Sequence, residues 1–174
     1  LNGILVASPA NPTGSMVDKE TLKNLINTAQ ENNVSFISDE IYHGIQYENN
    51  PTTALEITDK CYVINSFSKY FSMTGWRIGW MIVPEDHVRQ VERLSQNLFI
   101  CPPHVSQLTA LSAMDANIEL NENVNVYKKN REILLEELPK AGLGKFSPPD
   151  GAFYIYVDIS KYSNDSLNFC KEVL

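Results

Sequence analysis

The segment that carries most of the chemistry in this sequence reads Ser66-Phe67-Ser68-Lys69-Tyr70-Phe71-Ser72-Met73-Thr74-Gly75-Trp76-Arg77-Ile78-Gly79. It follows the apolar run 61–65, which predicts a buried strand, so Lys69 comes shortly after a strand end. Apolar neighbours would partly desolvate this lysine, and desolvation favours the uncharged, nucleophilic amine. Those neighbours are Phe67, Tyr70, Phe71 and Met73. Lys69 is therefore a candidate for Schiff-base chemistry, although a lysine beside aromatic residues is more often an ordinary surface residue.

The same segment contains polar groups that suit a phosphate. The hydroxyls of Ser66 and Ser68 come just before Lys69 along the chain, and Arg77 follows it. Arginine offers planar, paired donors to phosphate oxygens. Together these three side chains predict an anion site next to the lysine.

Polar clusters also follow the apolar runs that lie further upstream. The turn Asn11-Pro12-Thr13-Gly14 comes after the run 3–7, and Ser38-Asp39-Glu40-Ile41-Tyr42 ends the run 34–38. At a strand end, Asp39 could keep a ring nitrogen protonated, and the Tyr42 phenol could donate to an oxygen. Each cluster alone is typical of an ordinary turn. Their occurrence together and in this order favours a shared site.

The order of apolar runs and amphipathic stretches predicts an α/β fold with a mainly parallel sheet. A change of pattern between residues 100 and 125 suggests a second domain. Ligands of open α/β sheets bind beyond the carboxyl ends of the strands, where the polar clusters lie. The expected strands are 3–7, 34–38, 61–65, 77–83 and an antiparallel one at 146–158 bent at 148–151, and the expected helices are 18–32, 85–99, 105–114 and 123–140.

Composition excludes several classes of protein. The 174 residues are 43% hydrophobic and 20% charged, which fits an ordinary globular chain rather than a disordered one. The net charge of −7 argues against nucleic acid or an anionic membrane as the main partner. No apolar run is long enough for a membrane span. The three cysteines show no C-x-x-C pairing, so we expect neither a disulfide framework nor a metal site, and a cytoplasmic protein.

Three motifs together resemble one family. S-P-A-N-P-T-G at 8–14, S-D-E-I-Y at 38–42 and S-F-S-K-x(5)-G-W-R-I-G at 66–79 occur in the order and spacing of class I/II aminotransferases, which are pyridoxal-phosphate enzymes of fold type I in the aspartate aminotransferase superfamily. The resemblance runs from residue 1 to at least residue 157. It implies that 1–115 form the C-terminal portion of a three-layer α-β-α large domain, and that 116–174 form part of an α+β small domain.

The resemblance also implies a cofactor and roles for individual residues. Lys69 would form a Schiff base with the aldehyde of pyridoxal 5'-phosphate, Asp39 would pair with its pyridinium nitrogen, and Tyr42 would bind its phenolic oxygen. Released from the cofactor, the lysine would act as a base in a ping-pong transfer from an L-amino acid to a 2-oxo acid. The full set of expected cofactor contacts is Asn11, Asp39, Tyr42, Ser66, Ser68, Lys69 and Arg77.

Other readings of the same motifs remain open. Another fold-type-I enzyme, such as a carbon–sulfur β-lyase or a cyclopropane-forming synthase, would share the same Lys, Asp, Tyr and Arg residues. The sequence M-T-G-W-R-I-G at 73–79 favours an aminotransferase. A cofactor-sensing regulatory domain of a winged-helix repressor would bind the cofactor without turnover. The chain as it stands would also be inactive if essential parts of the site lie outside it.

The resemblance places several such parts outside these 174 residues. The aromatic residue that stacks on the cofactor and the glycine-containing phosphate loop are expected upstream, and the arginine for the substrate carboxylate is expected downstream. A homodimer is also implied.

Some residues near the motifs are expected to be structural. We assign packing or local roles to His43, Glu40 and Cys61, and an interdomain role to Arg131. The segment Gly151-Ala152-Phe153-Tyr154 resembles the small-domain strand that approaches the site in this family.

Overall fold

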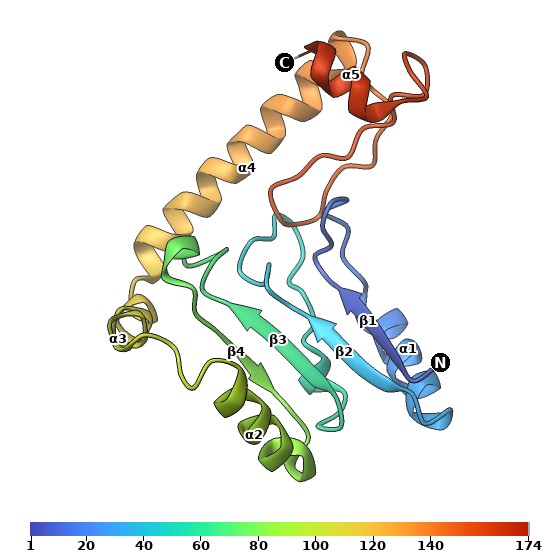
Figure 1. Cartoon of the computed structure of the whole chain (residues 1–174). Coiled ribbons are helices and arrows are strands. Elements are labelled where there is room, and N and C mark those ends of the chain that lie inside the picture. The colour runs from blue at the N-terminus through green and yellow to red at the C-terminus, as the bar shows by residue number, and fades with distance from the viewer. Residues whose placement is uncertain (174) are drawn as a thin grey trace.

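A four-stranded sheet with the order β1-β2-β3-β4 forms the centre of the chain (Figure 1). The structure is a computed structural model, and it describes residues 1–173. Strands β1 (Gly3–Ala7), β2 (Ser35–Asp39) and β3 (Tyr62–Ser66) are parallel, and β4 (Gly79–Ile82) runs antiparallel to β3. The predicted α/β fold with a mostly parallel sheet is therefore confirmed.

The register brings the ends of the strands to one edge of the sheet. Ala7 pairs with Asp39, and Asp39 pairs with Ile64 on β3. Ser66 lies two residues after Ile64 and pairs with Gly79 of β4. Because side chains alternate between the two faces of a sheet, Asp39 and Ser66 point to the same face.

Helix α1 (Lys19–Glu31) covers the other face of the sheet. It begins where the Asp18 carboxylate accepts hydrogen bonds from the backbone N–H groups of Glu20 and Thr21. Its apolar residues recur at helical spacing and pack on the strands, which fixes the helix against β2 and β3. The buried residues of this core are Leu22, Ile26, Ala29, Phe36, Ala54, Cys61 and Val63.

The face that carries Asp39 and Ser66 is more open. Leu5 of β1 is 59% exposed there and Met81 of β4 is 45% exposed. The structure thus shows the sheet and the layer formed by α1, whereas the third layer that the resemblance implies stays a prediction.

The remaining helices follow the sheet along the chain. They are α2 (Val88–Leu98), α3 (His104–Ala113), α4 (Asn117–Lys140) and α5 (Ser166–Val173), and short 3-10 turns cover Ala54–Glu56, Thr74–Trp76 and Glu85–His87. No helix within residues 1–173 combines the length and the hydropathy needed to cross a membrane.

Helix α4 begins six residues before the predicted start at residue 123. The added turns are rich in asparagine and glutamate, which hid the apolar period, but Leu120 within them is only 6% exposed. With 24 residues the helix is about 36 Å long. It therefore connects the region of the sheet to the C-terminal part of the chain (Figure 1).

The antiparallel strand predicted at 146–158 is wrong. Only isolated bridges occur there, between Phe146 and Val157 and between Gln46 and Gly151. Pro148 and Pro149 have no backbone N–H and so cannot donate hydrogen bonds to a neighbouring strand. The backbone N–H groups that follow them bond to other segments of the chain. The N–H groups of Asp150 and Gly151 both donate to the Gly14 carbonyl at 2.9 Å. The segment 146–158 is thus a loop bound to the turn that follows β1.

Candidate active site

The predicted site residues Asn11, Asp39 and Tyr42 meet beyond the ends of β1 and β2. Asp39 is the last residue of β2, and its carboxylate accepts a hydrogen bond from the Ile41 N–H, which shapes the turn leading to Tyr42. The Tyr42 side chain is only 2% exposed. Burial raises the pKa of Tyr42 well above its usual range, Tyr154 and Asp39 raise it further, and a side-chain hydrogen bond with Asn11 opposes them. Tyr42 therefore keeps its proton at neutral pH.

Lys69 lies next to this group. Its Nζ is 5.4 Å from the centre of the Tyr42 ring and 5.7 Å from that of Phe153, so two aromatic rings from distant segments approach the amine. The neighbours that the sequence suggested behave differently. Phe67 packs on Phe71 at 4.6 Å and on Trp80 at 5.1 Å between ring centres. Phe67, Phe71 and Met73 thus belong to a separate cluster, whereas Tyr70 packs against the cluster that contains Tyr42.

Ser66, Ser68 and Arg77 lie where β3 turns back into β4. The Ser66 hydroxyl accepts a hydrogen bond from the Ser68 N–H at 3.0 Å, which fixes the start of the turn. Arg77 has a left-handed backbone with φ of 51° and donates through Nη1 to the Thr74 carbonyl at 2.9 Å. Its side chain is exposed, so the guanidinium keeps donors for an anion.

Phe153 and Tyr154 complete the group. The Tyr154 hydroxyl is 2.6 Å from the Tyr42 hydroxyl, and the Phe153 ring meets the Tyr42 ring edge-on at 5.5 Å between centres. The resemblance predicted that this segment approaches the site, and the approach is confirmed. The hydroxyl pair was missed, because no local pattern links residues that are 112 positions apart.

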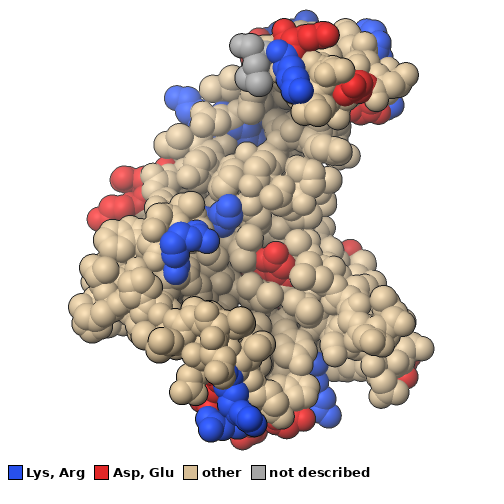
Figure 2. All heavy atoms as spheres, viewed as in Figure 1, with Lys and Arg blue, Asp and Glu red and all other residues tan. Residues whose placement is uncertain are grey.

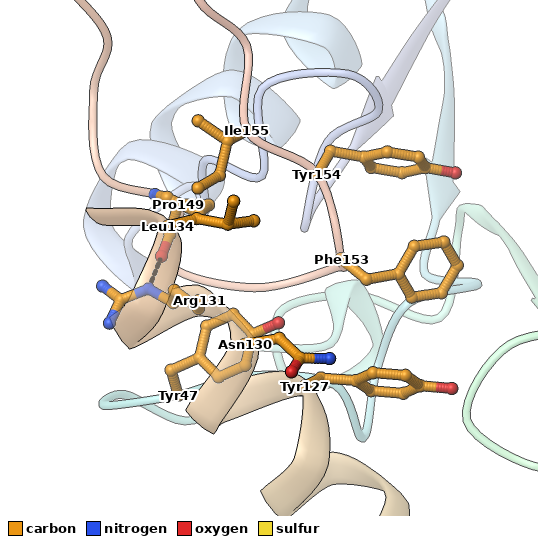
Figure 3. Close-up of a pocket in the computed structure, with 9 residues that line it drawn as sticks. All are labelled: Tyr47, Tyr127, Asn130, Arg131, Leu134, Pro149, Phe153, Tyr154 and Ile155. Atoms are coloured by element: carbon orange, nitrogen blue, oxygen red, sulfur yellow. Dashed lines mark hydrogen bonds between the residues drawn. The ribbon is translucent and has the colours of Figure 1, made fainter. Parts of the chain in front are cut away.

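A cavity of about 430 Å³ lies behind these rings, between α4 and the loop 146–158 (Figure 3). Arg131 of α4 donates through Nε to the Pro149 carbonyl at 2.8 Å, and its guanidinium lies 5.1 Å from the centre of the Tyr47 ring. Arg131 therefore ties α4 to two loops, a structural role. The lining residues are Tyr47, Tyr127, Asn130, Arg131, Leu134, Pro149, Phe153, Tyr154 and Ile155.

Glu40 and His43 support the strand ends from the other side. The Glu40 carboxylate is 2% exposed and accepts hydrogen bonds from the Ser38 hydroxyl at 2.9 Å and the Ala54 N–H at 2.8 Å. His43 reaches it with Nδ1 at 3.4 Å and the Ser8 carbonyl with Nε2 at 3.1 Å. Burial lowers the pKa of His43, and Glu40 opposes that shift. Both residues hold loops in place rather than face the group around Lys69.

The site thus offers an amine, a carboxylate, a phenol and an amide together, with hydroxyls and a guanidinium on the neighbouring turn. Residues 1–173 contain no group of at least three His, Cys, Asp or Glu side chains placed to hold a metal ion.

Comparisons with known proteins agree with this arrangement. The family "Aminotransferase class I and II" matches residues 1–174. A valine–pyruvate aminotransferase from Mycobacterium tuberculosis is 44% identical over 100% of this chain and 46% of its own length. An aspartate aminotransferase from Thermotoga maritima is 34% identical over 98% of this chain and 45% of its own. The chain therefore spans about half the length of these relatives.

Solved structures give the same picture. A crystal structure from Silicibacter pomeroyi, 62% identical, superposes with a TM-score of 0.96 and covers 99% of this chain and 46% of its own. The crystal structure of the T. maritima aspartate aminotransferase is 33% identical and reaches a TM-score of 0.91 over 99% of this chain and 45% of its own. With motifs, fold and site geometry in agreement, the chain belongs to the class I and II aminotransferases.

Proposed function

We propose that this chain carries the cofactor site of a pyridoxal-phosphate-dependent aminotransferase, which moves an amino group from an L-amino acid to a 2-oxo acid. The observation that carries the proposal is the position of the Lys69 amine, 5.4 Å from the centre of the buried Tyr42 ring. Asp39, at the end of β2, lies near enough to the same phenol to raise its pKa. An amine in this position can attack an aldehyde, and the neighbouring acid and phenol can bind the rest of a pyridine ring.

The chemistry of the side chains fits this cofactor group by group. Asp39 suits the ring nitrogen, Tyr42 and Asn11 suit the phenolic oxygen, and the turn with Ser66, Ser68 and Arg77 suits the phosphate. When bound, pyridoxal phosphate supplies an aldehyde and a ring that withdraws electrons from the α-carbon of the substrate.

Each residue then has a defined task. The Asp39 carboxylate would hold a proton on the ring nitrogen, and the Tyr42 hydroxyl would donate to the phenolic oxygen. Lys69 would hold the aldehyde carbon until the amino group of the substrate replaces it, and as a free amine would take the proton from the substrate α-carbon. It would deliver that proton to the cofactor carbon that carried the aldehyde oxygen, so Lys69 would serve as anchor, base and acid.

We further propose an aliphatic amino acid as donor and pyruvate as acceptor. The support is the identity of 44% to the valine–pyruvate aminotransferase against 34% to the aspartate aminotransferase from T. maritima. A panel of donors that compares valine with aspartate, and pyruvate with 2-oxoglutarate, tests this choice. Faster transfer from aspartate would overturn it.

Borohydride reduction tests the role of Lys69. The protein is used in its longest natural form. It is incubated with pyridoxal phosphate, reduced with borohydride and digested, and the masses of the peptides are measured by mass spectrometry. We expect a stable cofactor adduct on the peptide that contains Lys69, and none in Lys69→Ala. Lys60→Ala, which removes an exposed lysine before β3, is the matched control and should keep the adduct. An adduct on another lysine, or none in the unaltered protein, would refute the proposal.

A further inference from the structure

Tyr154 contacts the site through a single polar atom. Its hydroxyl is 2.6 Å from that of Tyr42, and the two rings meet edge-on with centres 5.8 Å apart. The segment that presents Tyr154 is firmly anchored. Ala152 is fully buried, its N–H donates to the Ile45 carbonyl at 2.9 Å, and its carbonyl accepts from the Tyr47 hydroxyl. The hydroxyl pair is therefore part of the folded framework.

The proton count of the pair limits what it can do. A phenol has one proton to donate and can accept from neighbours. If the Tyr42 hydroxyl donates its hydrogen bond to Tyr154, it has no proton left to donate to a ligand oxygen. If Tyr154 donates to Tyr42 instead, the proton of Tyr42 is left to point at a ligand. The second arrangement alone makes Tyr42 a donor to a bound molecule.

We propose that Tyr154 is a positioning residue that donates to the Tyr42 hydroxyl and thereby directs the proton of Tyr42 onto the phenolic oxygen of the cofactor. This inference rests on the proposed function, because it needs a ligand oxygen beside Tyr42. A second consequence follows from the site geometry. Tyr154 also lines the cavity next to α4, so the contact couples that cavity to the hydroxyl of Tyr42.

The proposal predicts a spectroscopic effect. Donors to the phenolic oxygen stabilise its anion and so lower the pH at which the lysine-bound cofactor loses its proton. Tyr154→Phe keeps the ring and removes one hydrogen bond, which corresponds to an upward shift of about half to one pH unit in the absorbance midpoint. Tyr156→Phe, an exposed tyrosine two residues further, is the control and should leave the midpoint unchanged.

A double variant separates positioning from packing. If Tyr154 acts only through Tyr42, adding Tyr154→Phe to Tyr42→Phe should shift the midpoint no further. A residue that merely packs would lower the melting temperature without moving the midpoint. An unmoved midpoint in Tyr154→Phe, or an additive shift in the double variant, would overturn the inference.

A measurement without cofactor distinguishes this failure from failure of the proposed function. With 3-fluorotyrosine placed at position 42, the fluorine NMR signal of the cofactor-free protein reports on the surroundings of this hydroxyl. Its chemical shift should change when Tyr154→Phe is introduced and should stay the same when Tyr156→Phe is introduced. A changed resonance with an unmoved absorbance midpoint would overturn the positioning role alone. Failure of borohydride to fix any cofactor at Lys69 would overturn the proposed function and the positioning role with it.

Discussion

Two adjacent acids show how position decides the chemistry of a residue at the strand ends. Asp39 points to the open face of the sheet, the face that also carries Ser66, and it lies near the phenol of Tyr42. Glu40 is 2% exposed, and Ser38 and the backbone of Ala54 occupy its oxygens. Because neighbouring residues leave a strand on opposite sides, one acid faces the site and the other holds a loop.

The cysteines permit a prediction at the same scale. Cys61 is fully buried, and burial raises the pKa of its thiol to about 11, whereas Cys101 and Cys170 are exposed. Thiolates are the reactive species, so Cys61 should resist Ellman's reagent at pH 8 while Cys101 and Cys170 react. Unfolding in guanidinium chloride should release the third thiol. Equal rates for all three in the native protein would contradict this assignment.

The same shift gives a pH dependence of stability. The folded pKa of Cys61 lies above its ordinary value of 9.0, so the unfolded chain loses this proton first. The contribution of Cys61 is therefore fully present below about pH 9 and is lost as the pH rises toward about 11. In Cys61→Ala, the urea concentration at the midpoint of unfolding should therefore fall less between about pH 9 and about pH 11 than it does in Cys101→Ala, which keeps the buried thiol.

At the scale of elements, the sequence predicted best where pattern and partner are local. The strand at residues 3–7 was placed correctly, because its apolar run is short and bounded by turn residues. The motifs likewise predicted that Asn11, Asp39 and Tyr42 meet, since parallel strands end at one edge. The loop 146–158 alternates like a strand, yet its N–H groups bond to Gly14 and Ile45. Contacts over such separations leave no local signal.

The contact between the loop 146–158 and the turn after β1 depends on Gly14. Gly14 has φ of +69°, and an added Cβ would lie 2.4 Å from Cβ of Pro149 and 2.7 Å from the Gly151 carbonyl oxygen. Gly14→Ala should therefore push the loop away and lower the free energy of unfolding by about 1–3 kcal/mol. Gly75→Ala is the matched control, since its Cβ would meet nothing within 4 Å. Thermal melting compares the two, and equal melting temperatures would show that the loop is not held at Gly14.

The whole molecule exposes more surface than a compact chain of its size. Its accessible surface is 11,507 Å², and a compact monomer of 19.6 kDa would expose about 8,600 Å². The excess is visible in the elongated outline, with α4 reaching away from the sheet (Figure 1). It is larger than the roughly 800 Å² that each partner buries in a standard interface. The surface is thus large enough for further protein to cover it.

An apolar patch marks where such contact should form. It lies on the end of α2, on α3 and at the start of α4, and Figure 2 shows uncharged surface over α3. Exposed apolar side chains gathered on neighbouring elements are typical of protein interfaces. The patch consists of Leu98, Phe99, Ile100, Val105, Leu108, Leu111 and Ile118, each more than half exposed.

We therefore predict that the chain self-associates through this patch, in line with the homodimer expected from its family. Leu111 is 69% exposed in the last turn of α3, and Leu111→Asp would bring a charge into the contact and raise the dissociation constant by about tenfold or more. Leu167→Asp, on α5 and 64% exposed, makes the same change outside the patch and should leave association unaltered. Sedimentation velocity over a range of concentrations measures both. A monomer at all concentrations, or equal weakening by the two substitutions, would show that the patch on α3 is not the contact surface.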